Sequence, residues 1–265
     1  MQRLHPSTTV DLASTSRCCF TLYPPVISQE MPHSGAQSTT AFAGSLPAEY
    51  RHRFNPAEIA AHAHVVQRRG GLPVSVGRFP WSDPEVAALC INALDRPGLL
   101  SLISRTMSEI GMQVKAAEAF CRDTKPREAL DFFWVWDKQG VLTDGEIERF
   151  AQLLTDGILG KRPDVAPHIA PAPSAGTTVR FLENKHGTLS VLEVETEDRS
   201  GLLWAISQAL HQSGVQIVGS QIRTEASRVL DRFMIEELEG GPIRDERRWQ
   251  IQVAILTALE SAQHQ

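Results

Sequence analysis

The chain has 265 residues and a formal net charge of −5, with 26 Lys and Arg against 31 Asp and Glu. A hydrophobic content of 42% is enough for a globular core in a chain of this length. The charge pattern lacks the basic stripe that nucleic-acid binding requires, so we expect no nucleic-acid partner. No apolar run approaches the roughly 20 residues that cross a bilayer, so we expect no membrane partner.

Cysteine usage is typical of a reducing compartment. Four cysteines are present, and none belongs to a C-x-x-C pair: Cys18, Cys19, Cys90 and Cys121. This spacing argues against a disulfide framework and against a zinc site. The apolar patch at residues 18–27 is interrupted by two prolines, so it does not form the roughly 7–15 apolar residues of a signal peptide. We therefore expect a cytoplasmic protein that binds no metal and no cofactor.

The N-terminal region has two parts. Residues 1–46 are rich in Ser, Thr, Pro, Gln and His without a hydrophobic period, which predicts a disordered tail or a wrongly chosen start codon. Residues 47–79 predict a helix and then a strand at residues 72–79. Within this helix Asn55 can act as N-cap, Pro56 suits the first turn, and Glu58 completes a capping box.

Two similar units follow, at residues 80–162 and 177–265, joined by a Pro- and Ala-rich linker at residues 163–176. Each unit has the order β-α-β-β-α by its hydrophobic period. We expect strands at residues 86–93, 112–120, 129–136, 177–184, 189–196, 215–223 and 228–237. We expect helices at residues 97–111, 142–159, 198–214 and 244–260.

The hexapeptides "DRPGLL" and "DRSGLL" occupy the same place in the two units, which keep one register. Asp95 and Asp198, Gly111 and Gly214, and Gln113 and Gln216 are each separated by 103 residues, while Asp131 and Asp231 are separated by 100. The difference of three residues is confined to a loop between two strands. Constant spacing with the change in a loop is what a duplicated domain should show.

A β-α-β-β-α unit that gains one more strand has the ferredoxin-like βαββαβ arrangement. Its strand–turn–helix with the D-x-x-G-L-L pattern resembles the ACT family, whose small regulatory domains bind amino acids. The residues that carry the resemblance are Asp95, Pro97, Gly98, Leu99 and Leu100, and Asp198, Gly201, Leu202 and Leu203. Ser200 stands where the first copy has proline. We therefore expect an α+β fold with two ACT-type domains in tandem.

Residues 47–265 as a whole resemble the C-terminal third of the bacterial PII uridylyltransferase/uridylyl-removing enzymes. In that family this region senses glutamine, and separate N-terminal domains carry out the chemistry. The present chain has no D-x-D motif for a nucleotidyltransferase and no H-D dipeptide for a metal-dependent phosphohydrolase. We therefore expect a small amino-acid ligand, glutamine in that family, and no catalytic residues.

The loop before each helix suits a zwitterionic ligand. The first N–H groups of a helix lack internal partners, and together with the helix dipole they favour a carboxylate. The aspartate could cap the helix or accept from an ammonium group, and glycine allows close approach or merely the turn. The predicted ligand-binding residues are Asp95, Gly98, Leu99, Gln113, Asp198, Gly201, Leu202 and Gln216. Both leucines can equally belong to the core, and both glutamines can face solvent on a strand.

Other side chains keep alternatives open. Asp131 and Asp231 share a sheet face with Phe133 and Phe233, where each could hydrogen-bond the loop or pair with a cation. Trp134 and Trp136 could pack as a second core layer or form a docking surface. Cys90 is expected in the core. His62 and His64 are two residues apart on a helix, which argues against a metal pair.

Three functions remain open. The first is a non-enzymatic amino-acid sensor that signals through a partner protein, with homodimerisation through the ACT units. The second is a detached or truncated regulatory part of a uridylyltransferase, and the third is a structural dimerisation module with an empty site. Unit two lacks a closing strand, so residues 177–184 could complete unit one, while residues 72–79 complete unit two or lie at an edge.

Overall fold

The computed structural model describes residues 39–136, 142–163, 167, 176–183, 188–225 and 227–261. The predicted tail at residues 1–46 includes too many residues, because helix α1 begins at Thr39. Residues 1–38 and most of the predicted linker lie outside the described residues. The helices are α1 (Thr39–Gly44), α2 (Ala48–Arg53), α3 (Pro56–Arg69), α4 (Leu99–Glu109), α5 (Asp144–Ile158), α6 (Leu202–Gln212) and α7 (Asp245–Ser261). The strands are β1 (Val74–Arg78), β2 (Ala87–Leu94), β3 (Gln113–Arg122), β4 (Glu128–Trp136), β5 (Thr178–Leu182), β6 (Ser190–Glu197), β7 (Val215–Glu225) and β8 (Arg228–Glu237).

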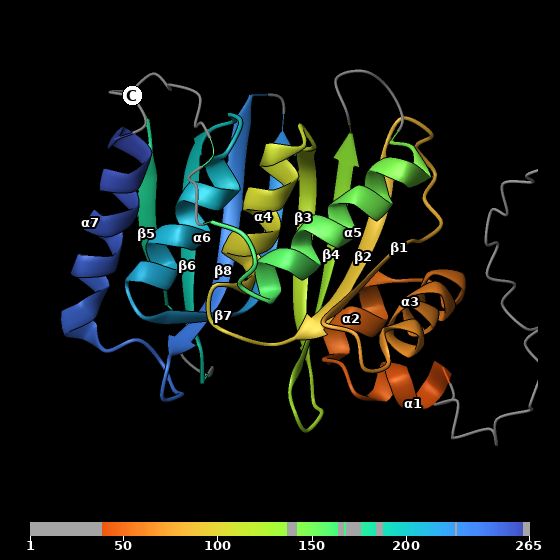
Figure 1. The fold of residues 1–265 in the computed structure, drawn as a ribbon. Coiled ribbons are helices and arrows are strands. Elements are labelled where there is room, and N and C mark those ends of the chain that lie inside the picture. The colour runs from red at the N-terminus through yellow and green to blue at the C-terminus, as the bar shows by residue number, and fades with distance from the viewer. Residues whose placement is uncertain are drawn as a thin grey trace, which may run out of the picture. The chain divides into compact units, whose positions relative to one another are not determined.

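All of these strands belong to one antiparallel sheet with the order β1-β2-β4-β3-β7-β8-β6-β5 (Figure 1). The first half of the sheet, β1 to β4, comes from residues 74–136, and the second half, β5 to β8, comes from residues 178–237. The fold is therefore α+β, with two βαββαβ-type repeats whose sheets are joined edge to edge. Strands of the first half have nearly continuous apolar runs, because both faces of that half are buried. A strand with one open face, such as β8, alternates between buried and exposed residues.

The expected exchange of edge strands between the units does not occur. β1 pairs with β2, with Val76 opposite Ile91, and β5 pairs with β6, with Arg180 opposite Glu193. Each unit thus takes its edge strand from the segment just before it, which gives the order β-β-α-β-β-α. The short connection makes this pairing the accessible one, since neighbouring strands in a chain usually pair in space.

The two halves meet at β3 and β7 around a local two-fold relationship. Glu118 of β3 lies opposite Gln221 of β7, and these two positions are themselves separated by 103 residues. Above the seam, the hydroxyl oxygens of Ser104 in α4 and Ser207 in α6 lie 3.3 Å apart, again at equivalent positions. The duplicated units therefore face each other with their equivalent residues in contact.

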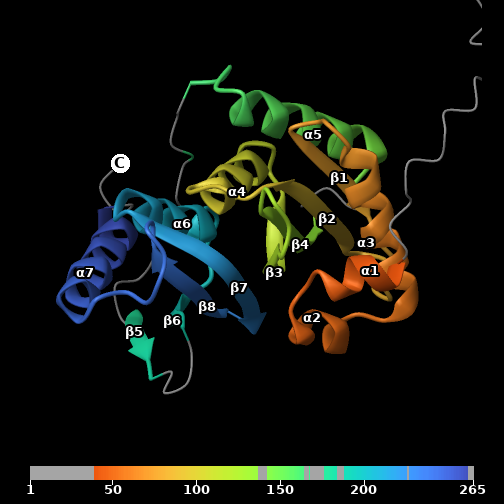
Figure 2. The same cartoon turned by 90° about the horizontal axis from the view of Figure 1, so that it is seen from below.

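Helices α4, α5, α6 and α7 cover one face of the sheet, and α1 to α3 lie against the other face of its first half (Figure 2). Tyr50, Phe54 and Phe132 form the centre of an aromatic cluster there, which also contains Trp134 and Cys90. Packing of Trp134 and burial of Cys90 are as expected from the sequence. Trp136 differs, because it remains 49% exposed.

The same face of the second half is built differently. Cys90 and Phe132, which lie opposite each other under the N-terminal helices, correspond to Glu193 and Arg232 in unit two. Glu193 is almost fully buried. Its carboxylate oxygens accept hydrogen bonds from the guanidinium groups of Arg180 and Arg232, with N–O distances of 2.5–2.8 Å. A hydrophobic pair in one copy has thus become an ion pair in the other, which suits a face that no described helix covers.

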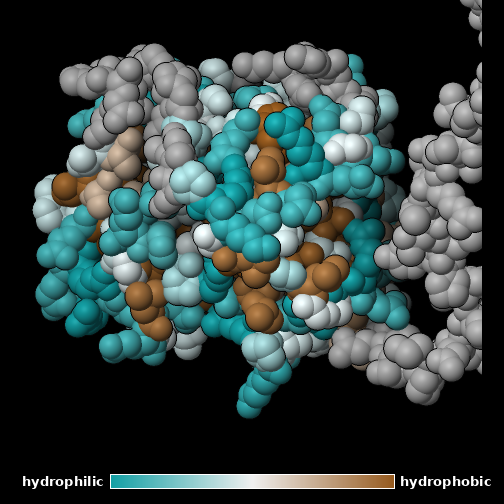
Figure 3. All heavy atoms as spheres, in the orientation of Figure 1, coloured by the Kyte–Doolittle hydropathy of each residue, from teal (hydrophilic) through white to brown (hydrophobic). Residues whose placement is uncertain are grey.

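The described surface gives no sign of a membrane-spanning helix. No helix within the described ranges is long and apolar enough to cross a membrane. Hydrophilic residues predominate over the face shown in Figure 3, and hydrophobic residues appear there only as separate patches.

Replacing Asn55 with alanine should lower the free energy of unfolding by about 1 kcal/mol, because the predicted capping box is present. The Asn55 side chain accepts from the backbone N–H groups of Ala57 and Glu58, and Glu58 accepts from the N–H of Asn55. Urea unfolding of Asn55→Ala beside Asn55→Asp measures this. Equal loss in both variants would show that the cap contributes nothing, since aspartate also caps.

Candidate functional site

Each D-x-x-G-L-L loop ends in a glycine that the backbone requires. Gly98 and Gly201 are the N-caps of α4 and α6, with φ of +78° and +81°. This left-handed conformation costs an L-residue about 1–2 kcal/mol, so the turn alone explains both glycines. Pro97 precedes the N-cap instead of occupying the first turn. Within the described residues neither helix has a side-chain cap, so the capping alternative for Asp95 and Asp198 is not realised.

The two loops lie at two cavities that the units build reciprocally. Asp95 and Gly98 line one cavity together with Gln216 of unit two. Asp198 and Gly201 line the other together with Gln113 of unit one. Each loop therefore faces the glutamine of the other unit, so each cavity needs both units. Leu99 and Leu202 border these cavities and are also buried in the main core.

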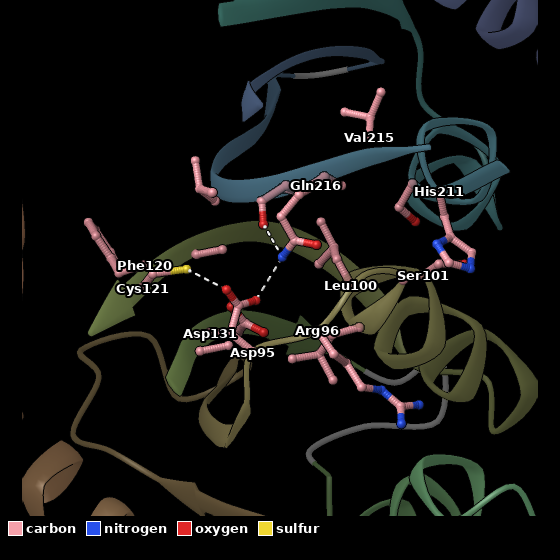
Figure 4. Close-up of a pocket in the computed structure, with 17 residues that line it drawn as sticks. Asp95, Arg96, Leu100, Ser101, Phe120, Cys121, Asp131, His211, Val215 and Gln216 are labelled. Carbon is pink, nitrogen blue, oxygen red and sulfur yellow. Dashed lines mark hydrogen bonds between the residues drawn. The ribbon is translucent and has the colours of Figure 1, made fainter. Parts of the chain in front are cut away.

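The carboxylate of Asp95 already has partners (Figure 4). The side-chain N–H of Gln216 donates to Asp95 Oδ1 at 2.9 Å, and the Cys121 thiol donates to Asp95 Oδ2 at 3.5 Å. Arg127 forms an ion pair with the same carboxylate at 3.3 Å. Burial raises the pKa of Asp95, and Arg127 together with these hydrogen bonds opposes the shift. The cavity beside Asp95, of about 30 Å³, is thus largely closed by the protein's own contacts.

Asp131 lies beneath the Asp95 loop on the helix-covered face of the sheet, as its alternation with Phe133 predicts. Burial raises its pKa to about 8, and the nearby charge of Asp95 adds to the rise. No described cation forms an ion pair with Asp131, so that alternative is not realised. A buried carboxyl group next to a second carboxylate favours the protonated form, because the charged form loses its hydration.

The cavity beside Asp198 is the larger, at about 80 Å³. The difference follows from substitutions between the copies. The ring of His211 lies against Gly98, 3.0 Å from where a Cβ would stand there, and Ser108 takes the equivalent place beside Gly201. Asp198 also has no arginine partner within the described ranges, since Ser227 stands where unit one has Arg127. Unit two therefore leaves both more space and a less satisfied carboxylate.

Unpartnered polar atoms border this second cavity. Neither carboxyl oxygen of Asp231 accepts a hydrogen bond from any residue that the structure describes, although Asp231 is almost fully buried. Burial raises the pKa of Asp231 well above its usual range, the charge of Asp198 adds to this, and the nearby backbone N–H of Arg223 opposes it without reaching hydrogen-bond geometry. The Nε–H of Arg199 is also buried and finds no acceptor in the described part of the chain. Such groups cost free energy unless a partner satisfies them.

Sequence reasoning singled out the loops and glutamines but missed several bordering residues. His211, Ser108 and Trp204 lie on the two helices, and Arg127 lies in a loop between strands, so no local pattern marks them. Their equivalent positions under the 103-residue register could have revealed the difference between the cavities. Trp136, half-exposed at the end of β4, also lines the second cavity.

Metal binding finds no support among the described residues. No three His, Cys, Asp or Glu side chains within the described ranges come together as a metal site requires. His62 accepts or donates a hydrogen bond with the Tyr50 hydroxyl at 2.8 Å inside the aromatic cluster. Burial lowers the pKa of His62 to about 3, so it is a neutral core residue.

Comparison with known proteins gives one consistent likeness. No family model matches the chain. The bifunctional uridylyltransferase/uridylyl-removing enzyme of Phenylobacterium zucineum is 28% identical over 235 residues, which are 84% of this chain and 24% of that enzyme. The enzyme of the same name from Caulobacter vibrioides (strain NA1000 / CB15N) is 28% identical over 222 residues, or 78% of this chain and 22% of the enzyme.

The chain spans about a quarter of the length of the curated relatives it matches. The similarity falls on their C-terminal, ACT-like region. Among solved structures, aspartate kinase from Synechocystis aligns at 12% identity and a TM-score of 0.20, over 68% of this chain and 40% of the kinase.

Proposed function

We propose that this chain, distantly similar to the C-terminal region of uridylyltransferase/uridylyl-removing enzymes, is a regulatory protein that binds a small amino acid beside Asp198. The observation that carries the proposal is the buried carboxyl group of Asp231, which borders a cavity and has no hydrogen-bond partner among the described residues. A ligand that donates hydrogen bonds to Asp231 would remove the cost of that burial.

The polar groups around the cavity match a zwitterion. An ammonium group would lie between Asp198 and Asp231. A carboxylate would accept from the Nε–H of Arg199 and from the N–H groups of Leu203 and Trp204 in the first turn of α6, which has no side-chain cap. Gln113, from the other unit, would contact the side chain of the ligand. Similarity to the uridylyltransferases makes glutamine the first ligand to test.

Binding at this place would regulate because the cavity lies between the units. A ligand that contacts both units shifts the population of their relative arrangements only by its differential affinity for them. We propose that a partner protein responds to this change in the cytoplasm, and that the chain has no catalytic residues of its own. A homodimer would use surfaces other than β3 and β7, because these edges pair within the chain.

A second candidate is the regulatory part of a uridylyltransferase-type enzyme that acts on a separate catalytic chain. The match to the C-terminal region of these enzymes favours it. The amino-acid site is the same in both candidates. Addition of this chain to a uridylyltransferase that lacks its own C-terminal region would separate them, because only the second candidate expects restored response to glutamine.

Thermal melting with a panel of amino acids tests the ligand. At saturation, about 100 times Kd, binding adds about 2.7 kcal/mol to the stability of the folded state, which raises Tm by about 5–10 °C in a chain of this size. We expect this rise for one amino acid, and a loss of the rise in Asp231→Asn and in Gln113→Ala.

The matched control is Gln216→Ala, which alters the equivalent glutamine at the closed cavity and should keep the rise. If no amino acid raises Tm at millimolar concentration, the proposed ligand site is wrong. The chain would then be a structural module with an empty site. Retention of the shift in both Asp231→Asn and Gln113→Ala would place the ligand elsewhere.

A further inference from the structure

A separate cleft of about 310 Å³ lies on the other face of the sheet, over β4, β3 and β7. Its walls come from the end of α2, the loop between β1 and β2, and the outward side chains of the three strands. The residues on which the argument rests are Arg53, Trp81, Asp83, Lys115, Trp134 and Arg223. Because α4 and α6 cover the opposite face, this cleft is distinct from the two cavities described above.

The cleft is rich in positive charge. Arg53, Lys115 and Arg223 line it, whereas Asp83 is the acidic side chain among the lining residues. Lys115 lies 3.4 Å from Asp83, which is a long and exposed contact. Arg223 is exposed, and no described residue forms an ion pair with it. An anion entering the cleft would therefore meet at least one guanidinium group free to form a bidentate contact.

Arg53 is held in place within this wall. Its Nε donates to Glu118 at 2.7 Å, and its guanidinium carbon lies 5.2 Å from the centre of the Trp134 ring. Arg53 therefore forms a fixed side of the cleft, and Arg223 and Lys115 are the cations that a ligand would meet.

An aromatic side chain stands beside these donors. Trp81 is 39% exposed and packs edge-on against Trp134, with ring centres 5.2 Å apart. Its remaining surface is available for stacking, and planar rings stack on such side chains with little dependence on their substituents. The equivalent place in unit two has neither the N-terminal helices nor Lys115, since Val218 occupies that position. The cleft is thus a feature of the first half alone.

We propose that this cleft binds a small molecule that combines a planar aromatic ring with an anionic group, the ring on Trp81 and the anion on Arg223 and Lys115. Nucleotides and aromatic carboxylates share this chemistry. The site goes beyond the amino-acid site proposed above and does not depend on it. Its place across the seam between the halves would let such a ligand contact both units.

Calorimetric titration distinguishes a nucleotide ligand from an aromatic carboxylate. The probes are AMP and indole-3-acetate, which carry both features, and adenosine and inorganic phosphate, which carry one each. We expect AMP or indole-3-acetate to bind at least about tenfold more tightly than adenosine or phosphate, because ring and anion act together. No binding of AMP or indole-3-acetate up to 10 mM, or equal binding of phosphate alone, would overturn the proposal.

Two variants of the cleft and two control variants locate the site. Arg223→Ser and Trp81→Leu should each weaken binding by about tenfold or more, since each removes one recognition element. Arg228→Ser changes an exposed arginine of β8 outside the cleft and should bind as the unmodified chain does. Asp231→Asn should also leave this binding unchanged, which separates failure here from failure of the amino-acid site. Unchanged affinity in both Arg223→Ser and Trp81→Leu would show that the cleft is not the site.

Discussion

Replacing Asp131 with asparagine should stabilise the protein at pH 8.5 by up to about 5 kcal/mol. The carboxyl group of Asp131 is buried. Its burial is the main cause, and the charge of Asp95 the second cause, of a rise in its pKa from 3.8 to about 8. Folding at high pH must therefore place a carboxylate where it is poorly hydrated, or take up a proton. Asparagine has a similar shape and never carries this charge.

The sign of the pH dependence follows from the direction of the shift. A pKa raised in the folded state stabilises that state fully below the unfolded pKa of 3.8, and this stability is lost as the pH rises through about 8. The free energy of unfolding should fall by about 1.4 kcal/mol per pH unit from this group between pH 6.5 and 8. Asp231 has a pKa shifted in the same direction and adds to the fall.

His62 acts at lower pH, which fixes the window of the measurement. Its pKa is lowered from 6.5 to about 3, so its contribution is complete above pH 6.5 and is lost as the pH falls towards 3. Urea unfolding at pH 6.5 and 8.5 therefore avoids the titration of His62. The exposed Asp123→Asn serves as control. A fall of equal size in Asp131→Asn and in the unmodified chain would show that Asp131 is not the titrating group.

Replacing Leu130 with alanine should cost about 2–5 kcal/mol of stability, whereas the same change at Leu230 should cost about 1 kcal/mol or less. The two leucines occupy equivalent positions of β4 and β8, separated by 100 residues. Leu130 is fully buried beneath the N-terminal helices, and Leu230 is only half-buried on the open face of the second half. Removing the same atoms therefore leaves a cavity at Leu130, whereas at Leu230 water can fill the space.

Urea unfolding of the two variants measures this difference, and the shared chemistry makes each the control for the other. Equal destabilisation would contradict the arrangement in one of two ways. A small loss at both sites would mean that α1 to α3 do not cover the first half in solution. A large loss at both would mean that the open face of the second half is covered, as by a second copy of the chain.

Much of the local structure follows from the sequence. The capping box at Asn55 and the alternation in β4 and β8 act over a few residues, so their consequences were predictable. The repeat predicted two units of one fold and an equivalent loop in each. Helix α1 was missed because its burial depends on Phe42 alone within a polar stretch, and propensity carries little information over six residues.

The candidate site depends on contacts between residues that are far apart in the sequence. The sequence placed Asp95 and Gln113 in one unit, but the tertiary structure brings Asp95 to Gln216, which is 121 residues away. Pairing of β3 with β7 decides this exchange, and no hydrophobic period encodes which edges of two similar units meet. The inequality of the cavities likewise depends on His211 and Ser108, each of which acts on the loop of the other unit.

The sequence by itself thus determined the duplicated α+β units and the glycine turns, because periodicity, capping and backbone strain act between near neighbours. Only the tertiary structure decided that each half keeps the edge strand that precedes it, and that the N-terminal helices bury one face of the first half. It also decided that Asp231 lies at a cavity with no partner among the described residues. These outcomes depend on contacts between segments far apart in the chain, where burial and hydrogen-bond satisfaction of the whole fold set the result.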